Sequence, residues 1–112
     1  MSITYPITVS GTFGQYTVEA IVEPDATFTR IPAPALIEMG IEPARVVRLQ
    51  CDDGEVRFFQ LGRALTTVAG VEDIAPVLFG KPGTPAVLGN VTLRILMLEL
   101  QGGELVQVSG RG

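Results

Sequence analysis

Two acidic residues stand close together in a largely apolar stretch, and carboxylates at such a spacing are candidates for acid–base chemistry. Glu23 and Asp25 flank Pro24 within the segment VEPDATFT, residues 22–29. Two carboxylates held near one another can share a proton, so that one acts as a base while the other acts as an acid. The same letters also suit an ordinary reverse turn, which favours proline and aspartate. Both interpretations stay open at this point.

The composition excludes much of the common hydrolase chemistry. The chain contains no histidine and a single cysteine, Cys51. It therefore cannot supply a Ser-His-Asp or Cys-His centre, a histidine metal site or a thiolate zinc cage. An acid cluster can hold a hard cation, but no ligand loop of the calcium type accompanies this one. We expect no metal and no cofactor, and we interpret Cys51 as a small apolar strand residue.

Charge and hydropathy narrow the range of partners. The net charge of −4 and the lack of a Lys/Arg cluster argue against a nucleic-acid partner. No apolar run approaches the ~20 residues that span a bilayer, and the start MSITYPITVSG lacks the features of a signal peptide. We therefore expect no membrane partner and a cytoplasmic location. With 46% hydrophobic and only 18% charged residues, the chain is apolar enough to suggest an oligomer.

The elements that would position the two acids are predicted to be mostly strands. Residues 15–22 alternate between apolar and polar faces, as a half-buried strand requires. Residues 44–62 are typical of two long strands joined at Asp53-Gly54, which suits the positive φ angles of a tight hairpin. A further strand is predicted at 71–79, a loop at 80–85, and a closing hairpin at 98–100 and 104–108.

Two short segments are predicted to be helical. The first covers residues 32–40 and ends at Gly40. The second covers 90–98, with Asn90 as the N-cap and with Val91, Leu93 and either Ile95 or Leu96 directed towards a core. A chain of 112 residues suits one domain, which we place at 1–108, followed by a flexible tail at 109–112.

Two segments resemble one another within the chain. AIVEPDATFTRIP, residues 20–32, and PAVLGNVTLRIL, residues 85–96, each run from an apolar strand through a tight turn to a threonine and a large apolar residue. This predicts a weak internal repeat.

These segments, with LIEMGI, the DDG hairpin and APVLFGKPGTPAVLGNVTLRILMLEL, resemble the retropepsin-like aspartic peptidases, the retroviral proteases and their bacterial relatives. The resemblance runs from about Val9 to Val108. It implies an all-β fold closed as an acid protease barrel, with one or two short helices and a flap hairpin whose tip is Cys51–Val56. It also implies a homodimer in which each subunit contributes an Asp-Thr-Gly loop, with residues 7–10 and 105–108 in the dimer sheet.

The signature triplet departs from the family pattern, because Glu23-Pro24-Asp25 stands where the family has Asp-Thr-Gly. The resemblance assigns catalytic positions to Glu23 and Asp25. It assigns substrate-binding positions to Ala26 and Thr27 and, at the flap tip, to Asp52, Asp53 and Gly54. Glutamate would move the carboxyl group by roughly 1 Å, and a shift of that order can cost about a hundredfold in rate.

The other two changes also weaken the motif. Pro24 lacks the hydroxyl and the N–H of the family's threonine, which ties the two loops together across the dimer. Asp25 replaces a glycine where the backbone must lie close to the reacting groups.

Three functions follow as alternatives. The first, which we favour because all three signature residues differ, is a degenerate homologue that binds an extended peptide in a groove at the dimer interface without cutting it. The second is an active or slow aspartic endopeptidase that uses Glu23, helped by Asp25, from each subunit. The third is a structural dimerisation module.

Overall fold

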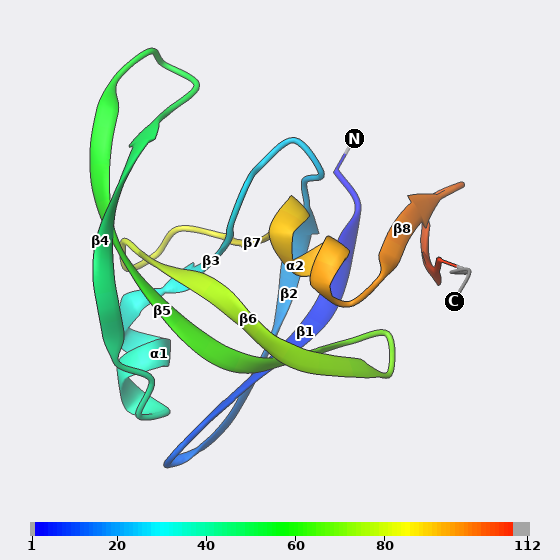
Figure 1. The fold of residues 1–112 in the computed structure, drawn as a ribbon, viewed down its shortest axis with the longest axis horizontal. Helices are drawn as coiled ribbons and strands as arrows, with labels where there is room; N and C mark the ends of the chain where they lie inside the picture. The colour runs from blue at the N-terminus through cyan, green and yellow to red at the C-terminus, as the bar shows by residue number, and fades with distance from the viewer. Residues whose placement is uncertain (1, 109–112) are drawn as a thin grey trace.

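Strands make up most of the chain in the computed structural model, which describes residues 2–108 (Figure 1). Within that range two short helices accompany them, α1 (Ala33–Glu38) and α2 (Asn90–Ile95). The strands are β1 (Thr4–Gly11), β2 (Gly14–Val22), β3 (Thr29–Pro32), β4 (Pro43–Gln50), β5 (Val56–Val68), β6 (Val71–Gly80), β7 (Ala86–Leu88), β8 (Leu98–Gln101) and β9 (Glu104–Gln107). The predicted tail at 109–112 lies outside the described residues.

Six of these strands close into a barrel. One sheet has the order β1-β2-β7-β3-β6-β5-β4, and β1 also pairs with β5 from Ile7↔Val68 to Ser10↔Leu65. Closure of this kind removes the exposed edges of the strands that take part. Within residues 2–108, β4 stays outside the barrel and pairs with β5 alone, while β8 and β9 form a separate two-stranded sheet. The prediction of a closed, mainly β fold with two short helices is confirmed.

The placement of residues 7–10 in a dimer sheet is wrong. Ile7 pairs with Val18 of β2 on one side and with Val68 of β5 on the other. Both edges of this segment are therefore used inside the barrel, and Ile7 and Val9 are fully buried. A strand with no free edge cannot add to a second subunit.

The core is a single hydrophobic cluster to which every barrel strand and both helices contribute. Leu36 enters it from α1 and Leu93 from α2. On β2 the predicted alternation is confirmed, because Ala20 and Val22 are buried while Glu19 on the other face is exposed. Burial of this apolar surface is the main stabilising term for such a domain.

The β4–β5 hairpin projects beyond the barrel (Figure 1). Its turn is closed by the bond from Gly54 N to Cys51 O, 2.9 Å, and by the bond from Cys51 N to Glu55 O, 2.8 Å. Gly54 has a φ of 82°, as predicted, but Asp53 does not share the positive φ. The loop therefore has three residues with one left-handed glycine, which is the next commonest hairpin form after the two-residue loop.

Both helices are shorter than predicted. α1 is followed by Gly40 with a φ of 79°, which confirms the predicted glycine end. Asn90 is the first residue of α2, and Gly89, not Asn90, occupies its N-cap without a side-chain hydrogen bond. Leu96, not Ile95, is the buried one of that pair. No helix within residues 2–108 is long and apolar enough to cross a membrane.

Candidate functional site

The two acids lie where the chain crosses the end of a neighbouring strand. β7 lies between β2 and β3 in the sheet, so the chain that leaves β2 must pass over the end of β7 to enter β3. The crossing segment is residues 23–28, here called the crossing loop. β2 and β7 run parallel with Ala20 opposite Ala86 and Val22 opposite Leu88. The two similar segments of the predicted repeat therefore lie side by side.

The crossing loop begins with a reverse turn. Ala26 N donates to Glu23 O over 3.0 Å, which leaves Pro24 and Asp25 at the central positions. Proline fixes the φ angle that the first of these positions requires, and aspartate is common in turns. The turn interpretation of the EPDA letters is confirmed, and the side chains of Glu23, Pro24 and Asp25 are exposed.

The backbone of the crossing loop is bound to the start of α2. Asn90 N donates to Ala26 O, 2.7 Å, and Val91 N donates to Thr27 O, 2.9 Å. The first N–H groups of a helix have no partner inside the helix. The loop carbonyls satisfy two of them, which explains why α2 needs no capping side chain. A third bond, from Glu23 N to Leu88 O over 3.0 Å, ties the loop to the end of β7.

A buried polar contact lies beneath the loop. The hydroxyls of Thr29 and Thr92 are 2.6 Å apart, and Thr29 Oγ1 accepts a bond from Gly89 N over 3.1 Å. Gly89 is required there for steric reasons, because a Cβ atom on it would lie 2.4 Å from the carbonyl carbon of Phe28. The loop can therefore pass close to Gly89 only while that residue has no side chain.

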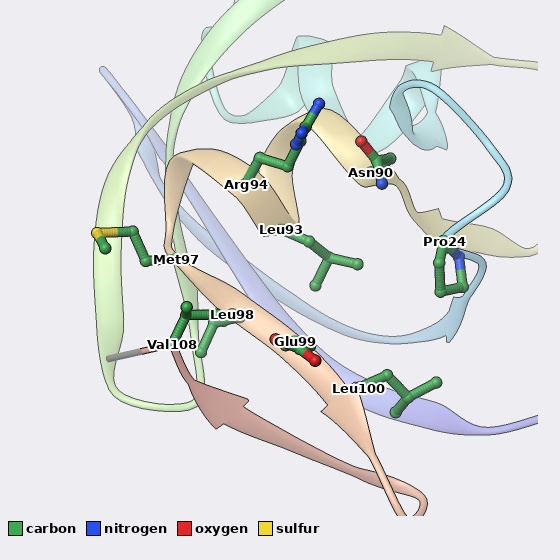
Figure 2. A pocket seen from close by; sticks show the side chains of 9 residues that line it. All are labelled: Pro24, Asn90, Leu93, Arg94, Met97, Leu98, Glu99, Leu100 and Val108. Atoms are coloured by element: carbon green, nitrogen blue, oxygen red, sulfur yellow. The ribbon is translucent and has the colours of Figure 1, made fainter. Parts of the chain in front are cut away.

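An open, mainly apolar hollow of about 490 Å³ lies beside the crossing loop, and we call it the α2 hollow (Figure 2). Figure 2 shows α2 on one side and β8 on the other, with Leu93 reaching between them. Met97 and Val108 at its margin are 51% and 40% exposed. It is lined by Pro24, Asn90, Leu93, Arg94, Met97, Leu98, Glu99, Leu100 and Val108.

A second hollow, of about 400 Å³, lies between the tip of the β4–β5 hairpin and the loop after β6, and we call it the hairpin hollow. It is lined by Arg30, Cys51, Asp52, Asp53, Arg57, Phe59, Lys81 and Thr84. Asp53 accepts two bonds from Arg57, the shorter 2.6 Å, and one from Glu55 N. These bonds hold the pKa of Asp53 below its ordinary value, chiefly through the Arg57 side chain.

The structure brings some predicted site residues together and separates others. Glu23, Asp25, Ala26 and Thr27 share the crossing loop, but Pro24 is its only residue that lines the α2 hollow. Ala26 and Thr27 act through their backbone carbonyls.

Asp52 and Asp53 line the hairpin hollow, and Gly54 forms the turn beside it without lining it. The predicted site residues thus form two groups, one in the crossing loop and one at the hairpin tip. Within a single chain, neither hollow is lined by residues of both groups.

Sequence reasoning missed several residues of the hairpin hollow, above all Arg30 and Lys81. The positions of Arg57 and Phe59 could have been predicted from the sequence, because the alternation along β5 puts both side chains on one face of the hairpin. No local pattern places Arg30 and Lys81 at this hollow. Arg30 lies on β3 and Lys81 follows β6, and only the pairing of these two strands brings both residues beside the hairpin.

The carboxylates of the crossing loop, Glu23 and Asp25, are exposed. As acid–base groups they can take a proton from a bound molecule or donate one to it. Within residues 2–108, neither Glu23 nor Asp25 forms an ion pair, and Arg57–Asp53 is the one salt bridge. The same residues include no group of three or more His, Cys, Asp or Glu side chains placed to hold a metal ion. A single chain thus presents two solvated acids on a firmly held loop.

No protein-family model matches the chain, and a search of curated proteins found no match.

Proposed function

We propose that the chain is a homodimeric, retropepsin-like protein that binds an extended peptide without cutting it. The observation that carries this proposal is the crossing loop. Three backbone hydrogen bonds fix it to β7 and α2, and they hold Glu23, Pro24 and Asp25 exposed beside an open apolar hollow. A loop held so firmly yet so exposed is suited to meeting another molecule.

The α2 hollow supports a second copy as the dimer partner. Leu93, Leu98 and Leu100 line it, and Met97 and Val108 expose much of their apolar surface at its margin. A contiguous apolar surface of this kind is usually covered in the working assembly. Pro24 of the crossing loop lines the same hollow, so in a twofold-symmetric dimer packed here each crossing loop would lie at or beside the interface. β9 pairs with β8 alone among the described residues, which leaves one of its edges for a partner strand.

The projecting hairpin supports a peptide as the ligand. Its inner face carries Val47, Leu49, Arg57 and Phe59, all partly buried, whereas Val46 and Phe58 on the outer face are 61% and 69% exposed. An extended peptide beneath such a hairpin would gain main-chain hydrogen bonds and side-chain contacts together.

The altered triplet supports binding over cleavage. Glu23 has a longer side chain than aspartate, and Pro24 offers neither a hydroxyl nor an N–H to a second loop. Asp25 places a charged group at the second central position of the turn, where the family has glycine. Cleavage would require two carboxylates to be placed to within a fraction of an ångström. The endopeptidase alternative keeps one point in its favour, since both carboxylates are exposed to an incoming substrate.

A digestion experiment tests the choice between binding and cleavage. A mixed library of unstructured peptides is incubated with the wild-type chain from about pH 4 to about pH 7, where carboxylates and their clusters change ionisation, and the masses are read. Glu23→Gln keeps the shape and removes the acid, and Glu19→Gln, on an exposed strand position, controls for loss of charge. We expect no new fragments with any of the three. Fragments that disappear only with Glu23→Gln would establish the endopeptidase instead.

A further inference from the structure

The hairpin hollow has more positive than negative charge, in a chain that is acidic as a whole. Arg30, Arg57 and Lys81 line it, against Asp52 and Asp53. Arg57 is already paired with Asp53 at 2.6 Å. Within residues 2–108, Arg30 and Lys81 have no carboxylate within ion-pair distance. Two cations of the hollow are thus free to meet an anionic group.

Arg30 is held in place but its hydrogen-bonding capacity is largely unused. Its aliphatic part lies over Gly80, where a Cβ atom would approach Cγ of Arg30 to 2.9 Å. One Nη atom donates to Pro85 O over 3.5 Å, which is long for a hydrogen bond. The Nε atom is buried and has no acceptor among the described residues. A guanidinium carries five N–H donors, and the long bond to Pro85 O is the one hydrogen bond that the Arg30 side chain makes within residues 2–108.

An anionic ligand would remove this deficit. A buried donor without a partner is costly, and a bond to a charged acceptor is worth more than one to a neutral acceptor. Arg30 lines the hollow, and a guanidinium pairs with a carboxylate through two of its N–H groups in a forked arrangement. Asp52 and Asp53 at the same hollow would repel a doubly charged group more than a singly charged one.

We infer that the hairpin hollow binds an aspartate or glutamate side chain of the extended peptide, and that Arg30 determines this preference. Lys81 adds positive charge at the same hollow, while Phe59 supplies an apolar wall for the methylene groups of the ligand. The inference rests on the proposed peptide binding and names the class of peptide that is bound.

A selection experiment tests the preference. The protein is mixed with capped peptides in which every position samples Asp, Glu, Asn, Gln, Ser and Leu, and the retained peptides are sequenced. Four proteins are compared: the wild type, Arg30→Gln, Arg30→Lys, and Arg63→Gln as a control on an exposed β5 position away from both hollows. Melting temperatures establish that all four are folded.

We expect the wild type and Arg63→Gln to enrich one acidic position. Arg30→Gln should lose that enrichment, with about tenfold weaker binding of the acidic peptide, and Arg30→Lys should keep part of it. Peptides retained without an acidic preference, or a preference that survives Arg30→Gln, would overturn the inference and leave peptide binding intact. If no peptide is retained by any protein, peptide binding itself is wrong and the inference falls with it.

A nuclear magnetic resonance titration reads the contact directly. The Nε–H signal of Arg30 is followed while the best acidic peptide, or the same peptide with glutamine in place of glutamate, is added. A shift of this signal with the acidic peptide alone supports the inference. An unchanged signal, or an equal shift with both peptides, contradicts it.

Discussion

The hydroxyl oxygens of Thr29 and Thr92 lie 2.6 Å apart in the buried interior, although 63 residues separate them in the sequence. Thr29 belongs to β3, just after the crossing loop, and Thr92 lies in the first turn of α2. With the bond from Gly89 N to Thr29 Oγ1, this contact fixes the loop that carries Glu23 and Asp25 against the helix below it.

Thr29→Val should destabilise the protein by about 2–3 kcal/mol, because it leaves both Gly89 N–H and the Thr92 hydroxyl buried without a partner. Thr92→Val should cost less, since Thr29 keeps its bond from Gly89. The control is Thr8→Val, which breaks the exposed 2.8 Å contact of Thr8 with Thr17 and should change stability by no more than about 0.5 kcal/mol. Urea unfolding measures all three. Equal losses for Thr29→Val and Thr8→Val would contradict the role of the buried contact.

Gly89→Ala should be among the most damaging small substitutions. The added Cβ would lie 2.4 Å from the backbone of Phe28, so the crossing loop would have to move. We expect a loss of about 3 kcal/mol. Gly83→Ala is the matched control, because a Cβ there meets no atom within 4 Å and only the φ of 82° opposes it, at about 1 kcal/mol. Thermal unfolding that ranks Gly83→Ala as the worse of the two would disprove the close crossing.

The turn of the β4–β5 hairpin should loosen in acid. The pKa of Asp53 is lowered from its ordinary value of 3.8, first by the bond from Arg57. A lowered folded-state pKa means that the ionised form stabilises the turn. Its contribution is complete above the ordinary pKa and is lost as the pH falls through the lowered one.

Amide signals of Gly54 and Glu55, followed against pH, should therefore change with a midpoint below 3.8. Arg57→Gln should raise that midpoint, since it removes the largest cause of the shift. Arg63→Gln serves as the control and should not affect it. A midpoint that is the same in the wild type and in Arg57→Gln would refute the assigned cause.

Met97→Asp should weaken the proposed dimer without unfolding the subunit. Met97 is 51% exposed at the α2 hollow and has a φ of 56°, a conformation that aspartate tolerates better than methionine. A charge in the proposed interface should raise the dissociation constant more than about tenfold. Ile74→Asp, at a 50% exposed position on β6 outside the hollow, is the control. If the wild type and Met97→Asp both sediment as dimers, the interface lies elsewhere. If the wild type sediments as a single chain, the proposed dimer is wrong.

Most helices, strands and turns could be predicted from local sequence patterns, because these features depend on residues that are near one another in the sequence. The alternation of β2, the turn at Pro24-Asp25 and the glycine after α1 are all of this kind. The wrong predictions concern features that are determined by contacts between segments far apart in the sequence. Asn90 is not the cap of α2 because carbonyls of the crossing loop already bind the free N–H groups.

Segment 7–10 illustrates the same limit for strands. Its alternation is compatible with an edge strand or a barrel strand, and only the pairing with β5 makes it the latter. In the candidate site, the residue types of the crossing loop predicted its turn. The position of Arg30 in the hairpin hollow could not be predicted in this way, because it depends on how β3 pairs with β6.

The measurement that tests the central claim most directly is native mass spectrometry of the protein with the peptides that it retains. It counts chains and reads the mass of the bound peptide in one experiment. We predict a complex of two chains with one intact peptide, and the loss of both the dimer and the peptide in Met97→Asp. Single chains without peptide, or two chains that release only fragments, would contradict the account of a dimer that holds a peptide and does not cut it.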